Sequence, residues 1–330
     1  MKKIKKTLIT LVILFLVTIG MMTREVEYKQ SLVDIKKGST TETIARNLKE
    51  SKLIRSEIIF RALSKLNRYD GTYRYGVVEI ESDMTFDEMA KVLQKGGLAT
   101  NVKRFTIPEG YTIDEMIDKL EKENVINREN FLAALNGNYD YEFLKDERNR
   151  TYKLEGYLFP DTYEIYENAS EKDIIVKMLN RFDRMYKEEY KLRAKELGYT
   201  FDEIVTIASI IEKEVKKKDE RKIVSGIIYN RLNINMKLEM CSTVQYLIEE
   251  KRSRLLFADL EIDSPYNTYM YAGLPKGPVG NPGEEAIKAA LFPQANDYLF
   301  FTRKSIETGE HHFSTTLEEH NWAKTKYYNT

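Results

Sequence analysis

Cysteine and histidine are scarce in this sequence, and its charges balance. Among 330 residues there is one cysteine, Cys241, which excludes an internal disulfide framework. The three histidines, His311, His312 and His320, lack the spacing of an HExxH-type motif, so we predict no metal site. Lys+Arg and Asp+Glu both number 52, which excludes the basic excess expected of a nucleic-acid-binding surface.

Long apolar runs are also rare, with one exception at the start of the chain. Residues 7–22, TLITLVILFLVTIGMM, carry no charge and follow four lysines. A spanning helix needs about 17 to 20 apolar residues, and this run reaches the lower value when Thr23 is counted. A cleaved signal peptide is the alternative, but residues 18–20 form a poor cleavage site. We therefore expect residues 1–24 to be a basic start and a single-pass membrane helix. The positive-inside rule then predicts a cytoplasmic N-terminus at the cell membrane, with residues 24–330 outside the cytoplasm.

A repeated pattern follows in residues 30–126. The stretch VDIKKGSTTETIARNLKESKLI (33–54) aligns without gaps to FTIPEGYTIDEMIDKLEKENVI (105–126). Residues 77–97 form a looser copy, with Asp83 where the other two have glycine. Each copy contains a short alternating strand, a turn, a threonine and then apolar residues at helical spacing. The pattern predicts strand–turn–helix units.

The rest of the chain is predicted to be mainly helical, with an unusual loop near its end. Residues 171–197 and 219–234 repeat apolar residues every three or four positions. Residues 264–283, SPYNTYMYAGLPKGPVGNPG, contain four of the seven prolines, and such a long loop in a compact domain is often functional. The elements predicted after it are a helix (284–292), two strands (298–302 and 311–315) and a last helix with the capping-box pattern Thr315-x-x-Glu318.

Two glutamates, Glu212 and Glu214, interrupt the apolar run of a helix predicted for residues 201–215. At 100° per residue they lie roughly 200° apart, one on each flank of the apolar arc, so they do not share an environment. Both could be surface residues paired with lysines four positions on. Alternatively, one is an acid in an apolar cleft, where desolvation raises its pKa so that it can donate a proton, as glycoside cleavage requires. The solvated sector is predicted to contain Thr206, Ser209, Lys213 and Lys217.

Several long motifs, taken together, make the sequence resemble a known family. They occur in the order LEGYLFPDTYEI (154–165), ASIIEKE (208–214), IIYNRL (227–232), STVQY (242–246), SPYNTYMYAGLPKGPVGNPG (264–283), AALFP (289–293) and HHFSTTLEEHN (311–321). Over about residues 30–330 the sequence resembles the endolytic murein transglycosylase family (MltG, also called YceG-like). The first repeat, with a second helix at 56–66, also resembles a LysM module, a βααβ fold that binds glycans of N-acetyl sugars. A packing unit without a ligand is the open alternative.

The resemblance implies an α+β fold class with three parts. These are an N-terminal transmembrane helix (1–24), a small LysM-like βα domain (30–100) and a larger, mainly helical YceG-like catalytic domain with a lysozyme-like glutamate cleft (101–330).

The implied activity is that of a membrane-anchored lytic transglycosylase, a carbon–oxygen lyase acting on polysaccharide, without a cofactor. Such enzymes cleave the β-1,4 bond between N-acetylmuramic acid and N-acetylglucosamine in nascent strands. The product ends are 1,6-anhydro sugars, and cleavage would terminate strand elongation. The implied partners are peptidoglycan glycan strands, the membrane and peptidoglycan synthases, with no nucleic acid. A non-catalytic glycan-binding scaffold and a true hydrolase stay open as alternatives.

The resemblance also selects the catalytic residue, which the helical wheel leaves undecided. It assigns catalysis to Glu214, the second glutamate of the I-E-K-E stretch. Glu212 is kept among the substrate-binding candidates, with a structural or supporting role. The following KKKDERK stretch (216–222) is interpreted as a solvated helix connection.

The remaining candidates are predicted to contact the substrate. Tyr266 and Asn267 resemble the Tyr-Asn pair that contacts the sugar in lytic transglycosylases, although an Asn turn in a proline-rich loop is an alternative. Glu155 either orients substrate or pairs with an arginine. Thr243 and Gln245 follow a stretch that often carries an acidic residue in the family. Here that stretch is Met-Cys-Ser, which puts a carboxylate role there in doubt.

Overall fold

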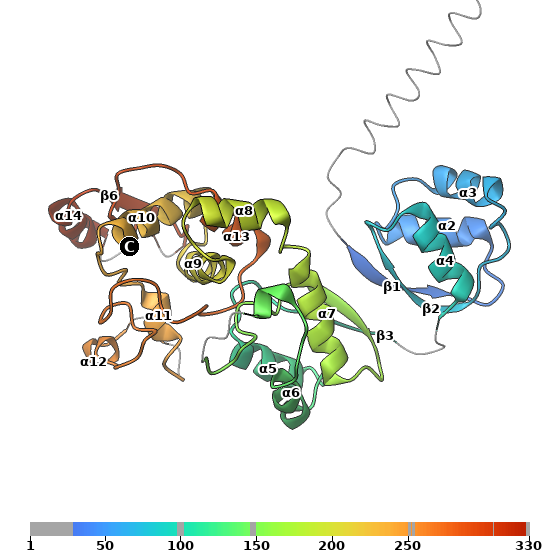
Figure 1. Cartoon of the computed structure of the whole chain (residues 1–330), viewed down its shortest axis with the longest axis horizontal. Helices are drawn as coiled ribbons and strands as arrows, with labels where there is room; N and C mark the ends of the chain where they lie inside the picture. The colour runs from blue at the N-terminus through green and yellow to red at the C-terminus, as the bar shows by residue number, and fades with distance from the viewer. Residues whose placement is uncertain are drawn as a thin grey trace, which may run out of the picture. The chain divides into compact units, whose positions relative to one another are not determined.

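The computed structural model describes residues 29–97, 102–145, 150–249, 252, 255–305 and 307–327 (Figure 1). The chain divides into two compact units. The small unit comprises Met1–Lys103 and Tyr163–Glu167, and the large unit comprises Arg104–Thr162 and Asn168–Thr330. All predicted site residues belong to the large unit.

The small unit is built around one antiparallel strand pair. Its elements are β1 (Gln30–Ile35), α2 (Thr41–Glu50), α3 (Glu57–Leu66), β2 (Gly76–Glu81) and α4 (Phe86–Lys95). In the strand pair Gln30 lies opposite Glu81 and Ile35 opposite Gly76. The strand–helix–helix–strand order is the one that a LysM resemblance implies, while the LysM identity and any glycan binding stay predictions. The core contains Val33, Ile35, Ile44, Ala45, Leu48, Leu53, Phe60, Val78, Ile80, Met89 and Leu93.

From residue 102 onward, helices alternate with short strands. The strands pair as β3 with β4 and β5 with β6. The elements are β3 (Val102–Thr106), α5 (Ile113–Lys122), α6 (Arg128–Leu135), η1 (Glu142–Leu144), β4 (Thr162–Tyr166), α7 (Glu171–Asp183), α8 (Glu188–Glu196), α9 (Phe201–Glu214), η2 (Lys218–Glu220), α10 (Arg221–Asn233), α11 (Cys241–Gln245), α12 (Phe257–Leu260), α13 (Glu284–Leu291), β5 (Phe300–Arg303), β6 (His311–Ser314) and α14 (Leu317–Tyr327).

The three strand–turn–helix units predicted from the repeat are confirmed. Thr40, Thr85 and Thr112 are the N-caps of α2, α4 and α5, and each side chain accepts a hydrogen bond from a backbone N–H of the first helical turn. Gly38 and Gly110 have φ values of +83° and +79°, a conformation that glycine adopts without steric cost. Local capping and turn chemistry therefore explains why each unit folds alike.

Two predicted helix boundaries are wrong. The helix predicted over 171–197 is interrupted between α7 and α8, where the Tyr186 ring packs edge-on against Phe201 at 4.9 Å between centroids. The last helix is capped one residue later than predicted, because the Thr316 hydroxyl accepts from the Glu319 N–H. Tyr186 and Phe201 are fifteen positions apart, and the apolar periodicity of one helix does not reveal a contact at that separation.

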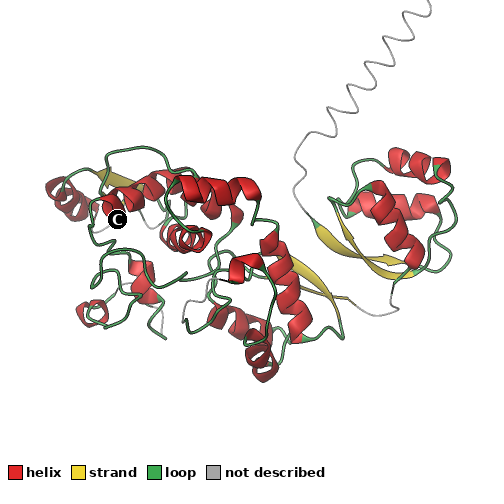
Figure 2. Ribbon diagram, viewed as in Figure 1, coloured by secondary structure: helices red, strands yellow, loops and turns green. Residues whose placement is uncertain are grey.

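The predicted fold class is wrong. The described residues form a mixed helix and strand structure with three two-stranded sheets (Figure 2). The strand β4 (Thr162–Tyr166) lies in a part of the chain predicted to be mainly helical, and five residues are too few to stand out among long helical repeats. The longest described helix, α9, has 14 residues. Among the described residues no helix is both long and apolar enough to cross a bilayer. Residues 7–22, for which a membrane helix was predicted, lie outside the described residues.

Candidate active site

The helix α9 is the buried axis of the large unit and ends at the predicted acid. It packs against α8, α10, α11 and α13 (Figure 1). A capping box between Thr200 and Glu203 fixes its first turn, and Glu214 is its last residue. The next residue, Val215, is extended. The fold therefore presents the Glu214 side chain at the end of a rigid, buried element.

The polar face predicted for α9 is wrong in part. Thr206 and Ser209 were placed in the solvated sector, but they are 0% and 1% exposed. Both hydroxyls donate to backbone carbonyls one turn earlier, and the Ser209 hydroxyl also accepts from the Val279 N–H at 3.0 Å. Small hydroxyl residues can be buried on a helix because the preceding turn satisfies them.

Glu214 is half-buried, and its carboxylate meets the start of α11. Its Oε1 accepts a hydrogen bond of 2.7 Å from the Ser242 N–H. This is the only hydrogen bond to Glu214 among the described residues. Its other oxygen is therefore available to a ligand. A backbone N–H at a helix start suits a carboxylate, because the first N–H groups of a helix lack partners within it.

Two side chains near Glu214 were not among the predicted site residues. The Cys241 thiol and the Tyr269 hydroxyl lie 3.2 Å apart. Desolvation raises the pKa of both groups, and the negative charge of Glu214 raises each of them further. Both groups are therefore neutral and able to donate hydrogen bonds at neutral pH. Tyr269 lies in one of the motifs that support the family resemblance, and Cys241 directly precedes another. The motifs do not show which tyrosine of the loop approaches the acid.

Glu212 occupies a different environment from Glu214, as the helical wheel predicts. It forms a two-point ion pair with Arg221, and both side chains are 5% exposed. Its Oε2 also accepts from the Gly283 N–H at 3.1 Å, at the start of α13. Glu212 thus joins the ends of α9, α10 and α13, which is a structural position. The interpretation of residues 216–222 as a solvated connection is wrong for Arg221.

Glu155 is fully buried and contacts the proline-rich loop, which comprises residues 264–283. Its Oε1 accepts from Asn281 Nδ2 at 2.9 Å, and its Oε2 from the Ile113 N–H at 3.3 Å. The Tyr246 hydroxyl lies 3.2 Å from the same Oε2. With 1% exposure, Glu155 is bonded to neighbouring segments, and its hydrogen-bond partners among the described residues do not include an arginine. Its predicted contact with substrate stays a prediction.

The burial of Glu155 predicts a pH dependence of stability. Desolvation raises the pKa of this carboxyl to about 8 from an ordinary value of 4.5, against the opposing hydrogen bonds. Between those two values the unfolded chain loses a proton that the folded chain keeps. The free energy of unfolding therefore falls as pH rises from about 4.5 to 8, by up to about 1.4 kcal/mol per pH unit.

The variant Glu155→Gln should remove this slope, since an amide is neutral in both states. It also loses one hydrogen bond, at a cost of about 1 kcal/mol at every pH. Urea unfolding at pH 5 and pH 8, followed by the fluorescence of the single tryptophan Trp322 in α14, measures both effects. Equal slopes in the wild type and the variant would contradict the raised pKa.

Tyr266 and Asn267 are both buried in the proline-rich loop. The Tyr266 ring packs on Tyr246 with centroids 5.0 Å apart, and its buried hydroxyl has no hydrogen-bond partner in the described structure. Asn267 is 0% exposed and donates to the carbonyls of Leu260 and Ile262. Asn267 therefore shapes the loop, in agreement with the alternative of an Asn turn.

Thr243 joins the start of α11 to the same loop. Its hydroxyl lies 2.9 Å from the Thr268 hydroxyl and donates to the Met240 carbonyl. Thr268 accepts in turn from the Met240 N–H. These bonds fix the turn that carries Ser242, so Thr243 acts on Glu214 through α11. Gln245, by contrast, is turned toward the backbone of Arg252.

Asn281 closes the far end of the loop. Its Oδ1 accepts from the N–H groups of Gly156 and Leu158, and its Nδ2 donates to the Tyr111 carbonyl and to Glu155. The structure therefore brings two groups of predicted residues together. Glu214 and Thr243 meet at α11, while Glu155 and Tyr266 meet at Tyr246. Glu212 instead pairs with Arg221, and Gln245 bonds to the backbone of Arg252.

Metal ligation finds no support in the described part of the chain, where no three His, Cys, Asp or Glu side chains are grouped to hold an ion. His311 instead pairs with Glu220, with 2.7 Å between Nδ1 and Oε2.

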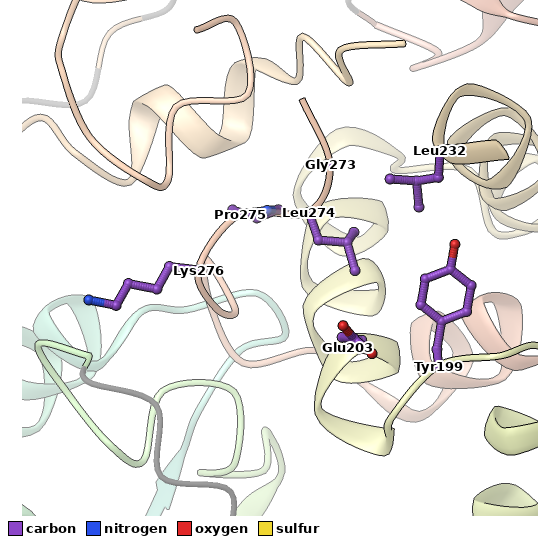
Figure 3. Close-up of a pocket in the computed structure, with 7 residues that line it drawn as sticks. All are labelled: Tyr199, Glu203, Leu232, Gly273, Leu274, Pro275 and Lys276. Carbon is purple, nitrogen blue, oxygen red and sulfur yellow. The ribbon is translucent and has the colours of Figure 1, made fainter. Parts of the chain in front are cut away.

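A separate cavity of about 590 Å³ opens near the other end of α9 (Figure 3). Figure 3 shows Lys276 extending away from Tyr199, Glu203 and Leu232. Glu203 lies eleven residues before Glu214, which is about 16 Å along a helix. This cavity contains none of the predicted site residues. It is lined by Tyr199, Glu203, Leu232, Gly273, Leu274, Pro275 and Lys276.

Known proteins match this chain over most of its length. A protein named endolytic murein transglycosylase from Bacillus subtilis (strain 168) is 34% identical over 308 residues, covering 89% of this chain and 84% of that protein. One of the same name from Streptococcus pneumoniae serotype 2 (strain D39 / NCTC 7466) is 32% identical, covering 88% of this chain and 57% of that protein. A crystal structure described as a yceG-like protein from Listeria monocytogenes has a TM-score of 0.59 at 32% identity, covering 90% of this chain and 99% of that one. The model of the YceG-like family matches residues 33–326. This chain therefore belongs to the YceG-like family.

Proposed function

We propose that this chain is a lytic transglycosylase that cuts peptidoglycan strands internally. The observation that carries the proposal is the position of Glu214, half-buried at the end of α9, with one carboxylate oxygen bound to Ser242 N–H and the other available. The names of the relatives, endolytic murein transglycosylase, support the same activity.

The proposed reaction uses Glu214 twice. Protonated Glu214 gives its proton to the glycosidic oxygen between N-acetylmuramic acid and N-acetylglucosamine, and the bond from that oxygen to C1 breaks. The carboxylate, stabilised by the Ser242 N–H, then takes the proton of the muramic C6 hydroxyl while O6 bonds to C1. The products are a 1,6-anhydro end and a free sugar hydroxyl, and no water is consumed.

A second carboxylate is not required by this route. A retaining hydrolase needs one about 5 Å from the acid, as nucleophile. The two other predicted carboxylates have partners of their own, because Glu212 is paired with Arg221 and Glu155 with Asn281. This arrangement favours the transglycosylase over the hydrolase.

The masses of the products test the proposal. Purified full-length protein should convert uncrosslinked glycan strands into fragments whose muramic ends are one water lighter than hydrolysis products. Internal cutting should give fragments of many lengths from the first minutes. Reducing ends that contain an added water would instead indicate a hydrolase. Strands that bind but stay uncut would indicate a glycan-binding scaffold.

We also propose that the large unit works outside the cytoplasm, at the cell membrane, where nascent glycan strands and peptidoglycan synthases are found. The four lysines that precede the uncharged residues 7–22 support a cytoplasmic N-terminus. Protease added to spheroplasts should then degrade the large unit. Full protection in intact spheroplasts, with digestion after lysis, would contradict this location.

A further inference from the structure

The helix α3 of the small unit has two apolar faces, although a helix of a small domain needs only one. Its inner face packs on α2, and its Phe60 is 3% exposed. On the outer face Ile58 and Leu66 are each 78% exposed and Ile59 is 49% exposed. Ala62 is also exposed. At 100° per residue these four side chains fall within an arc of about 100°. We call them the α3 face.

Positive charge borders the α3 face. Lys65 and Arg61 follow it on one edge of the helical wheel, about 20° and 60° from Ile58. Residues 55–68 contain four basic residues and one acidic residue, so their net charge is 4 − 1 = +3. That acidic residue, Glu57, is paired with Lys49 at 3.1 Å. Arg61 forms an exposed ion pair with Glu42 of α2 at 3.4 Å, and such surface pairs are weak. The exposed edge is therefore cationic as well as aliphatic.

This combination fits an anionic lipid surface better than the other possible occupants. Aliphatic side chains that enter the headgroup region, flanked by Lys and Arg, are the pattern of interfacial helices. Sugars are recognised by aromatic rings and hydrogen-bonding groups, and the α3 face offers neither. A second copy in a two-fold contact would bring two segments of charge +3 together, which is unfavourable.

The chain length is compatible with this contact. The uncharged residues 7–22 end seven residues before β1 begins at Gln30. Seven extended residues span at most about 25 Å. The small unit therefore stays close to whatever binds residues 7–22.

We propose that the α3 face docks on the surface of an anionic phospholipid bilayer. Ile58, Ile59, Ala62 and Leu66 enter the headgroup region. Lys65 contacts lipid phosphates, and Arg61 does so by exchanging its surface pair with Glu42 for a phosphate. The inference rests on the proposed location at the membrane and is independent of the proposed enzymatic activity.

Photocrosslinking of the full-length protein tests the contact. Replacing Ala62 with p-benzoyl-phenylalanine puts a crosslinker at the centre of the face, and replacing the exposed Lys91 of α4 gives a matched control. Each protein is reconstituted into vesicles of phosphatidylglycerol and phosphatidylethanolamine, and separately into phosphatidylcholine vesicles. We expect lipid adducts at position 62 in the anionic vesicles, at least about tenfold above position 91 and above the phosphatidylcholine sample.

A double substitution, Ile58→Gln with Leu66→Gln, should lower the adduct yield by about tenfold or more. Cutting of soluble strands should not change, since neither residue belongs to the large unit. Protein–protein adducts at position 62 would overturn the proposal in favour of a second copy. Equal yields at positions 62 and 91, or in both lipids, would overturn it as well. If strand cutting is absent in every sample while lipid adducts form, the proposed function fails and the docking stands.

Discussion

Glu214→Gln should reduce the rate of strand cutting by about a thousandfold while leaving the fold intact. General acid–base catalysis by one side chain contributes roughly 10² to 10⁴ in rate, and Glu214 is proposed to act both as acid and as base. The amide oxygen of glutamine can still accept from the Ser242 N–H, so α11 keeps its place. The measurement is kcat on uncrosslinked strands, with the urea midpoint as the check on folding.

Glu285→Gln is the matched control, because Glu285 is an exposed glutamate of α13 and its substitution should change neither quantity. The assignment of the acid would be wrong if Glu214→Gln cuts normally while Glu212→Gln does not cut although it is folded. A thousandfold loss accompanied by unfolding would say nothing for catalysis. For that reason activity is compared per folded molecule.

Glu212→Gln should have the opposite profile, a large loss of stability with cutting retained in the molecules that stay folded. It leaves the buried charge of Arg221 without its main counterion, and breaking a buried pair in this way costs roughly 3 kcal/mol or more. Glu109, 3.9 Å from the Arg221 guanidinium and half exposed, compensates for only part of the loss. Urea unfolding followed by Trp322 fluorescence reports the large unit alone, since the chain has one tryptophan.

A double variant separates charge from packing. Replacing Glu212 and Arg221 together by leucine removes both charges, so the free energy of unfolding should recover relative to Glu212→Gln. If Glu212→Gln is as stable as the wild type, the ion pair does not hold α9, α10 and α13 together as described.

The sequence predicts those parts of the fold whose structure is determined by residues close together in the chain. The three strand–turn–helix units depend on a threonine cap and a turn within a few residues, and all three are confirmed. The burial of Arg221 escaped prediction because it depends on how α9 and α10 pack together and on α13, whose Gly283 N–H binds the same Glu212 carboxylate from a distant part of the chain. A basic run in a sequence therefore indicates solvent exposure only when no buried carboxylate of a neighbouring helix faces it.

The candidate site, too, is predictable from the sequence only in part. A helical wheel separates Glu212 from Glu214, and the structure gives them different partners, but only the family resemblance selects Glu214 as the acid. Among the tyrosines of residues 264–283, sequence favours Tyr266 beside Asn267. The structure instead buries Tyr266 and places Tyr269 near Glu214, beside Cys241. Which ring approaches the acid depends on how the loop closes on α11, and no local pattern encodes that.

The proline-rich loop (residues 264–283) is held at both ends by hydrogen bonds. Thr268 joins it to the start of α11, and Asn281 joins it to the segments around Tyr111 and Gly156. It therefore cannot swing as a whole like a lid. Between these anchors, Met270 and Tyr271 are exposed, and Gly273 has open space around it. Differences in length or sequence that relatives accumulate in this loop should concentrate in this short middle part. Adaptation to different glycan substrates would then leave the geometry around Glu214 unchanged.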